Sequence, residues 1–281
     1  MNILVTGGAG FIGTNLCERL VADGHDVVSL DNYFTGSTDN HVAGVTYVIG
    51  GTRSIHEVLP TDKFDIIYHL GEYARVEQSF EDWDLVYKFN KLGTMSVLEY
   101  AKKINAKLVY AGSSTKFADN HDGYIKSPYT WSKESNTELV KLFCQWNSID
   151  YAITYFYNVY GPREMGNGKY GTLIALFKEK IKNGEPLTIV LPGSQRRNFT
   201  HVDDIVDGLI IIGEKGYGDE LGIGHDESYS VMEVAGLFGG PIKILPERKG
   251  NRISGKVVTD RTKALGWYPK RNLEDYIQNG C

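Results

Sequence analysis

Three polar side chains near the middle of the sequence have the types and spacing needed for acid–base chemistry. Tyr129 and Lys133 are four residues apart, and Pro128 suits the first turn of a helix that would carry both on one face. An ammonium group beside a phenol favours the phenolate, so Tyr129 could serve as a base. Ser113 follows a short apolar segment, and its hydroxyl could hydrogen-bond the reacting oxygen. The pattern therefore predicts a site that exchanges a proton with a substrate.

The same tyrosine-to-lysine spacing occurs a second time, at Tyr87 and Lys91. No strand that ends in a hydroxyl-bearing loop precedes this second pair, so the third member of the arrangement is missing there. We interpret the second pair as part of an exposed helix face and assign the chemistry to Tyr129 and Lys133.

The elements that would position these side chains begin at the N-terminus, with an apolar strand and a glycine loop. The strand is expected at Asn2–Thr6, and Gly7, Gly10 and Gly13 follow it. Gly7 permits a tight turn, Gly10 lets the backbone approach a pyrophosphate, and Gly13 lets the next helix pack against the strand. The N–H groups at the start of that helix would face the anion. This stretch therefore predicts a dinucleotide-binding site.

An acidic residue closes the second predicted strand, Val27–Leu30, about 20 residues after the glycine loop. Asp31 would hydrogen-bond the ribose hydroxyls of adenosine, and its charge would repel a 2′-phosphate. The next residue is Asn32 rather than an arginine that could accommodate that phosphate. NAD is therefore the predicted cofactor rather than NADP.

Composition excludes several other classes of function. The 281 residues carry a net charge of −5 with both signs mixed, which argues against a nucleic-acid or anionic-membrane surface. Cys17, Cys144 and Cys281 lack ligand spacing and are expected to be reduced thiols, and the histidines form no metal-binding pair. No secretion signal or membrane-spanning run is apparent. We expect a cytoplasmic protein without a metal.

Strand and helix patterns alternate through the first half of the chain, which predicts an α/β fold with a Rossmann-type, doubly wound parallel sheet. Loops at the carboxyl ends of such strands converge on one cleft. After Gly161-Pro162 the pattern becomes shorter and more mixed, so a smaller mixed α/β substrate-binding lobe is expected. We expect residues 1–163 with about 198–213 to bind NAD, and about 164–197 with 214–281 to form the second lobe. Further strands are expected at Val45–Ile49, Asp65–His69, Lys107–Ala111 and Tyr151–Phe156.

Five motifs in this order resemble the extended short-chain dehydrogenase/reductase family. They are TGGAGFIG at residues 6–13, Asp31, the Ser113 loop, YTWSK at residues 129–133 and YNVYGPR at residues 157–163. The nucleotide-sugar epimerase and dehydratase branch is the most similar, especially the UDP-glucose 4-epimerase-like 4-epimerases. The resemblance implies a catalytic triad of Ser113, Tyr129 and Lys133, and a homodimer formed by the helices near 82–103 and 128–146. The implied NAD contacts are Gly7, Gly10, Phe11, Ile12, Gly13, Asp31, Asn32, Thr52, Leu70, Tyr129 and Lys133.

The resemblance also implies a nucleoside-diphosphate sugar as the substrate, with UDP as the expected nucleotide. Asn158 resembles the family asparagine that contacts the diphosphate, and Arg197 and Arg248 resemble two arginines that clamp it. Guanidinium groups bind such oxygens in a bidentate manner. Arg75 falls in the loop that faces the sugar, where it would either recognise a carboxylate or another acceptor, or be a charge at the rim. Ser113 would contact the sugar directly.

Two departures from the family pattern stand out. Gly71-Glu72 replaces the usual Ala-Ala after His69, which places an acid close to the cofactor. Ser114 and Thr115 stand where related dehydratases have Asp-Glu, and hydroxyls are poor acid–base groups near neutrality. The glutamate of nucleotide-uronate decarboxylases and the cysteine of C3 or C5 epimerases are also missing. We therefore expect a reversible oxidation at C4, which inverts that centre.

Three alternatives remain open on the same residues. A nucleotide-4-ketosugar reductase would exchange free NADH, and a nucleotide-uronate decarboxylase would release carbon dioxide. A non-catalytic NAD-binding regulator is the third, but such a protein has no need to keep Ser113, Tyr129 and Lys133 together.

Overall fold

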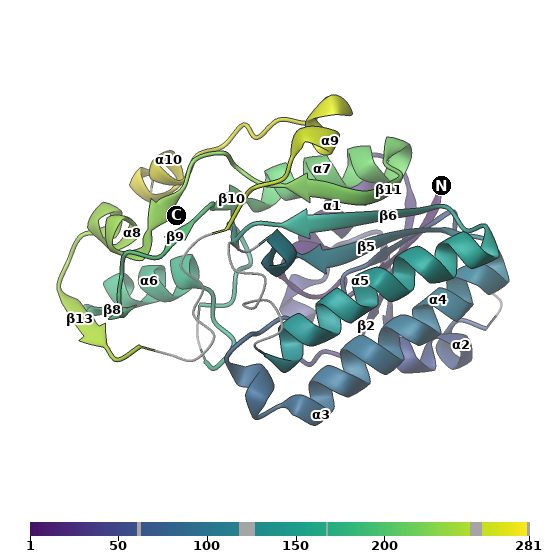
Figure 1. Cartoon of the computed structure of the whole chain (residues 1–281), viewed down its shortest axis with the longest axis horizontal. Coiled ribbons are helices and arrows are strands. Elements are labelled where there is room, and N and C mark those ends of the chain that lie inside the picture. The colour runs from purple at the N-terminus through teal and green to yellow at the C-terminus, as the bar shows by residue number, and fades with distance from the viewer. Residues whose placement is uncertain (61–62, 118–126, 167, 248–254, 280–281) are drawn as a thin grey trace.

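A seven-stranded parallel sheet forms the centre of the computed structural model, which describes residues 1–60, 63–117, 127–166, 168–247 and 255–279 (Figure 1). The strand order is β3-β2-β1-β4-β5-β6-β11. From β1 the chain first adds β2 and β3 on one side and then β4, β5 and β6 on the other, and the crevice for a ligand lies at this switch point, at the carboxyl ends of the strands. The predicted doubly wound α/β fold is confirmed. The strands are β1 (Asn2–Thr6), β2 (Asp26–Asp31), β3 (Val45–Ile49), β4 (Ile66–His69), β5 (Lys107–Ser113), β6 (Tyr151–Phe156) and β11 (Gly218–Ile223).

Successive residues of each strand point to opposite faces of the sheet, and most of them are apolar. Both faces must therefore be buried, and helices cover each of them. In β1, Leu4 packs in one hydrophobic core, whereas Ile3 and Val5 pack in another on the opposite face. The first core is covered by α4 (Gly93–Ile104) and α5 (Pro128–Asn147), and the second by α1 (Phe11–Ala22) and α7 (Val202–Lys215). The shorter helical segments here are α2 (Ile55–Val58), α3 (Trp83–Val86), a π segment at Tyr87–Leu92, and 3₁₀ turns at Thr38–Asn40, Thr52–Ser54, Gln78–Phe80 and Ser114–Phe117.

The helix that carries the predicted base has a well-defined start. Ser127 accepts a hydrogen bond from the Thr130 N–H at 3.1 Å, and the Thr130 hydroxyl in turn accepts from the Ser127 N–H. Pro128 occupies the first turn, where its missing N–H costs nothing. This cap fixes the first turn of α5, on which Tyr129 lies, and Lys133 lies one turn further along.

A second, smaller lobe has its own hydrophobic core. Buried residues of this core come from helices and from β8, and β13 pairs with β8 in parallel at the exposed edge. Figure 1 shows this lobe beyond the carboxyl ends of the main sheet. Its elements are α6 (Leu173–Lys182), β8 (Leu187–Val190), β9 (Arg196–Arg197), β12 (Tyr229–Ser230), α8 (Val231–Phe238), β13 (Ile242–Leu245) and α10 (Leu273–Gln278), and β7 (Val159–Tyr160) pairs with β10 (Thr200–His201) nearby.

Two differences from the sequence-based expectation change the layout of the main sheet. The strand β5 continues to Ser113, two residues beyond the predicted end, because Gly112 and Ser113 still pair with β6. The strand β11 was expected in the second lobe, but it pairs with β6 at the edge of the main sheet. The following helix α9 (Asp260–Ala264) leads to Trp267, whose indole N–H donates to the Asp204 carbonyl at 2.8 Å in α7. Part of the C-terminal segment therefore completes the Rossmann layer.

Candidate active site

A cavity of about 570 Å³ lies at the carboxyl ends of the central strands and receives residues from both lobes. This volume is typical of small-molecule and cofactor sites. All the residues predicted to contact NAD line it: Gly7, Gly10, Phe11, Ile12, Gly13, Asp31, Asn32, Thr52, Leu70, Tyr129 and Lys133.

The glycine loop has the backbone shape that a dinucleotide requires. Gly7 has a φ of 74°, in the left-handed region. A Cβ on Gly13 would lie 2.1 Å from the Gly7 carbonyl oxygen, so only glycine allows the helix to approach this closely. The Asp31 carboxylate accepts hydrogen bonds from the Ala9 N–H at 2.9 Å and the Tyr33 N–H at 2.8 Å, which holds it beside the loop. These residues fit the pyrophosphate and adenosine ribose of NAD.

The three predicted catalytic side chains come together from two elements. The Tyr129 hydroxyl of α5 donates to Ser113 Oγ at the end of β5, at 3.3 Å. Ser113 Oγ also lies 2.9 Å from Thr115 Oγ1, so a second hydroxyl supports it. The Lys133 ammonium donates to the Ala111 carbonyl and its side chain is only 6% exposed. Ser113 itself is not among the residues that line the cavity, but it is hydrogen-bonded to Tyr129, which is.

The predicted substrate contacts are only partly brought together. Asn158 and Arg75 line the cavity. The Arg75 guanidinium donates from Nε to the Tyr170 carbonyl at 2.8 Å and from Nη1 to the Ala74 carbonyl at 2.8 Å, so it bridges two loops. Arg197 lies in β9, is not among the lining residues, and donates from Nη1 to the Arg196 carbonyl at 2.7 Å. Arg248 falls outside the described residues.

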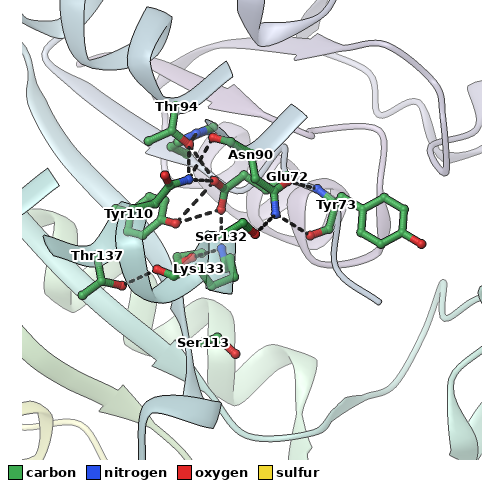
Figure 2. Close-up of polar contacts among 12 residues, drawn as sticks. Glu72, Tyr73, Asn90, Thr94, Tyr110, Ser113, Ser132, Lys133 and Thr137 are labelled. Carbon is green, nitrogen blue, oxygen red and sulfur yellow. Dashed lines mark hydrogen bonds and ion pairs between the residues drawn. The ribbon is translucent and has the colours of Figure 1, made fainter. Parts of the chain in front are cut away.

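The acid at position 72 is engaged with the catalytic lysine. Glu72 follows β4, its side chain is 3% exposed, and its carboxylate forms an ion pair with the Lys133 ammonium. Thr94 donates to it at 2.6 Å, Asn136 at 2.9 Å and Tyr110 at 3.0 Å. Figure 2 shows the Thr94, Tyr110 and Lys133 side chains converging on the Glu72 carboxylate, with Ser113 set apart from them. Burial disfavours the charged form, but the charge of the Lys133 ammonium together with the hydrogen bonds from Lys133 and Thr94 holds the pKa of Glu72 below its usual value.

Sequence reasoning missed the asparagine that joins this region to the catalytic helix. Asn90 accepts from the Tyr73 N–H at 2.7 Å and donates to the Tyr73 carbonyl at 3.1 Å. It also donates to Ser132 Oγ at 2.9 Å, one residue before Lys133. Asn90 therefore connects the loop after β4 to α5. In the sequence, the only hint of this role is that a polar asparagine follows that loop in a helical segment.

A second carboxylate in the cavity wall was also missed. Glu164 accepts from the Gly161 N–H at 2.9 Å and from the Thr172 hydroxyl at 2.7 Å. Burial raises the pKa of Glu164 to about 7. The sequence carries no signal for this shift, because it depends on how deeply the loop after β7 is covered.

A model of the NAD dependent epimerase/dehydratase family matches residues 3–224. The chain belongs to this family. The expected kinship with the extended short-chain dehydrogenases is therefore confirmed, and NAD is the cofactor. When bound, NAD supplies a hydride acceptor and donor to the cavity.

Three members of the family illustrate the similarity. The chain is 31% identical to UDP-glucuronic acid decarboxylase 5 of Arabidopsis thaliana over 98% of its length, and covers 86% of that protein. It is 27% identical to the UDP-glucose 4-epimerase of Thermus thermophilus solved with NAD, with a TM-score of 0.88 over 99% of this chain and 97% of that one. The UDP-glucose 4-epimerase of Thermotoga maritima solved with UDP-glucose is 27% identical, with a TM-score of 0.89 over 99% and 96%.

The described residues form neither a membrane-spanning helix nor a metal site. None of the helices in these ranges combines the length and apolar character needed to cross a bilayer. Within the same ranges, no cluster of three or more His, Cys, Asp or Glu side chains is arranged to hold a metal ion. Cys17 and Cys144 are buried free thiols.

Proposed function

We propose that this protein is an NAD-dependent isomerase that inverts C4 of a UDP-linked sugar. The observation that carries the proposal is the contact of 3.3 Å between the Tyr129 hydroxyl and Ser113 Oγ, beside the cavity that the glycine loop closes at its other end. Lys133 lies on the same helix, within reach of a cofactor ribose in that cavity. This is the geometry of a reversible alcohol oxidation.

The residues of the chain would divide the work as follows. Tyr129 takes the proton of the C4 hydroxyl and later returns it, while Ser113 hydrogen-bonds the same oxygen. The Lys133 ammonium favours the phenolate of Tyr129 electrostatically. NAD held beside Tyr129 and Lys133 would supply the acceptor and then the donor of the C4 hydride, so no cofactor would be consumed.

The loop after β5 favours epimerisation over the reactions of other family branches. Thr115, not a carboxylate, lies next to Ser113, with 2.9 Å between the two hydroxyl oxygens. A hydroxyl near neutrality cannot provide the general acid or base that elimination of water requires. Decarboxylation of a UDP-uronate remains the second candidate, because the Arabidopsis relative carries that name.

The substrate contacts belong to the proposal. We assign the sugar to the space between Tyr129 and Arg75, and the diphosphate to the side of Asn158. Arg197 and Arg248 are assigned to the same diphosphate from the family resemblance alone. A guanidinium carries five N–H groups, and Arg75 uses three of them on backbone carbonyls, which leaves two for an acceptor on the sugar. We assign NAD to residues 1–163 with about 198–213, and the nucleotide sugar to the remainder. The strand β11 is the exception, because it pairs with β6 in the main sheet and so belongs to the NAD layer.

We further propose that the protein is a cytoplasmic homodimer. Large apolar side chains lie exposed along the helix that contains α3 and α4, namely Trp83, Tyr87 and Met95, and Trp146 is 70% exposed at the end of the adjacent α5. Exposed apolar groups on neighbouring helices indicate an interface, and a two-fold axis would pair these helices with their copies. Sedimentation equilibrium should give twice the mass of the chain, and Trp146→Glu should lower it.

The test is proton NMR of the purified protein with UDP-glucose, UDP-N-acetylglucosamine and UDP-glucuronate in turn, without added cofactor. The anomeric signal of the matching galacto epimer is expected with at least one of them, and its loss is expected in Tyr129→Phe. Release of carbon dioxide from UDP-glucuronate would instead establish the decarboxylase. Turnover close to that of the wild type in Tyr129→Phe would overturn the assignment of the base.

A further inference from the structure

The carboxylate of Glu72 has no capacity left for a ligand. A carboxylate offers about four acceptor positions. Here Oε1 receives Thr94 and Asn136, and Oε2 receives Lys133 and Tyr110. Although Glu72 lines the NAD cavity, it therefore cannot accept a hydrogen bond from the cofactor or substrate without losing one of these donors.

The direction of the hydrogen bonds around Glu72 is also fixed. The Thr94 hydroxyl gives its proton to Glu72, so the contact of 3.0 Å between Thr94 and His69 requires His69 Nε2 to be the donor. His69 Nδ1 then accepts from the Thr6 hydroxyl at 2.8 Å. Burial lowers the pKa of His69 to about 4, so this histidine stays neutral at the pH of catalysis.

Lys133 is held by the same arrangement. An ammonium group has three N–H donors, and Lys133 uses one on Glu72 and one on the Ala111 carbonyl. One donor remains for the cofactor side of the cavity. The ammonium therefore has a fixed orientation before any ligand binds.

We propose that Glu72 is a positioning residue for the reaction, which orients Lys133 and offsets the charge that Lys133 directs at Tyr129. The proposal rests on the proposed function, since it acts on the same tyrosine. A negative charge directly behind the ammonium opposes the phenolate electrostatically, so the enzyme works at a higher pH than it would with an uncharged residue at this position.

The other charged or titratable groups that face Glu72 do not replace it. From β4, His69 is neutral, and from β5, Tyr110 is a donor whose pKa is raised by burial. From the π segment, Lys91 reaches Asn136 Oδ1 at 2.8 Å and Ser135 rather than the carboxylate. Lys133 of α5 is thus the cation in direct contact with Glu72 among the described residues.

The test is the pH profile of kcat/KM for three single variants. Glu72→Gln removes the charge with little change in size, and Tyr110→Phe is the matched control, because it removes one hydrogen bond to the same carboxylate and leaves the charge. The acidic limb is expected to move down by about one pH unit in Glu72→Gln and to stay in place in Tyr110→Phe. Glu72→Ala, which leaves room for water, should move the limb in the same direction if Glu72→Gln does not fold.

A second readout does not depend on turnover. The near-ultraviolet phenolate absorbance of the holoenzyme is titrated with and without the additional change Tyr129→Phe, and the difference isolates Tyr129. This difference titration should also move to lower pH in Glu72→Gln. A limb and a titration that stay in place or move upward, or that move equally in Tyr110→Phe, would overturn the proposal. If the protein had another activity, the titration alone would still decide the role of Glu72.

Discussion

Two carboxylates in the wall of one cavity are held in opposite ways. Glu72 lies just after β4 at the carboxyl ends of the main sheet, where the ion pair with Lys133 and further hydrogen bonds keep its pKa below the usual value in spite of burial. Glu164 lies on the loop before α6, where its hydrogen bonds come from the neutral Gly161 N–H and Thr172 hydroxyl, and burial raises its pKa to about 7. The comparison teaches that the partner, not the depth of burial, decides whether a carboxylate in this cavity carries charge.

The strongest way to break this comparison is to remove the partner. In Lys133→Met, Glu72 would become a buried, unpaired carboxylate, and the free energy of unfolding should fall by about 4 kcal/mol at neutral pH. The ion pair of the wild type stabilises above the ordinary pKa of a glutamate, and that contribution is lost as pH falls through the lowered pKa. The deficit should therefore shrink on acidification. Urea unfolding measures it.

The control for this experiment is the double variant Lys133→Met with Glu72→Gln. Removing both charges leaves no unpaired ion, so most of the lost stability should return. A double variant as unstable as Lys133→Met would show that packing of the lysine, rather than its charge, supports this region.

The second prediction concerns Glu164, the carboxylate whose pKa is raised. The raised pKa of Glu164 means that the folded protein holds its proton more tightly than the unfolded chain, so this group costs stability as pH rises from about 4.5 through about 7. Glu164→Gln should increase the free energy of unfolding by about 3 kcal/mol near pH 8.5 and by less than about 1 kcal/mol near pH 5. Glu185→Gln, at an exposed carboxylate of the same lobe, should change it by less than about 0.5 kcal/mol. An equal gain at both pH values would contradict the assigned pKa.

A smaller effect on stability is expected from the hydrogen bond that the Tyr110 hydroxyl donates to Glu72. Tyr110→Phe removes a donor at 3.0 Å and should cost about 1 kcal/mol of unfolding free energy. Tyr160 is the matched control, because it is also fully buried but its hydroxyl has no hydrogen-bond partner among the described residues. Tyr160→Phe should be neutral or slightly stabilising in the same urea measurement. Equal losses in both variants would mean that ring packing, not hydrogen bonding to Glu72, is being measured.

The smallest expected effect is that of Arg75 on the pKa of Glu164. Arg75 attracts the Glu164 carboxylate across the cavity without an ion pair to it, so Arg75→Gln should raise the pKa of Glu164 by a few tenths of a unit. Carbon NMR of the side-chain carboxyl groups measures this shift. The resonance of Glu72 should not respond, and a comparable shift there would mean that the two carboxylates share one electrostatic environment.

Much of the fold followed from local patterns in the sequence. The alternating apolar segments predicted the parallel sheet, and the glycine loop with Asp31 predicted the NAD site, because both depend on residues close together in the chain. The edge strand β11 was assigned to the wrong lobe, since its pairing partner β6 ends more than 60 residues earlier. The pattern of apolar residues within a strand does not show which distant strand it pairs with.

The candidate site divides in the same way. The sequence alone determined that Tyr129 and Lys133 share one helix face, because helical geometry brings residues four apart together. Only the tertiary structure decided what surrounds them. Glu72 meets Lys133 from 61 residues away, and Glu164 changes its pKa through burial, because ion pairing and desolvation depend on which distant segments pack together.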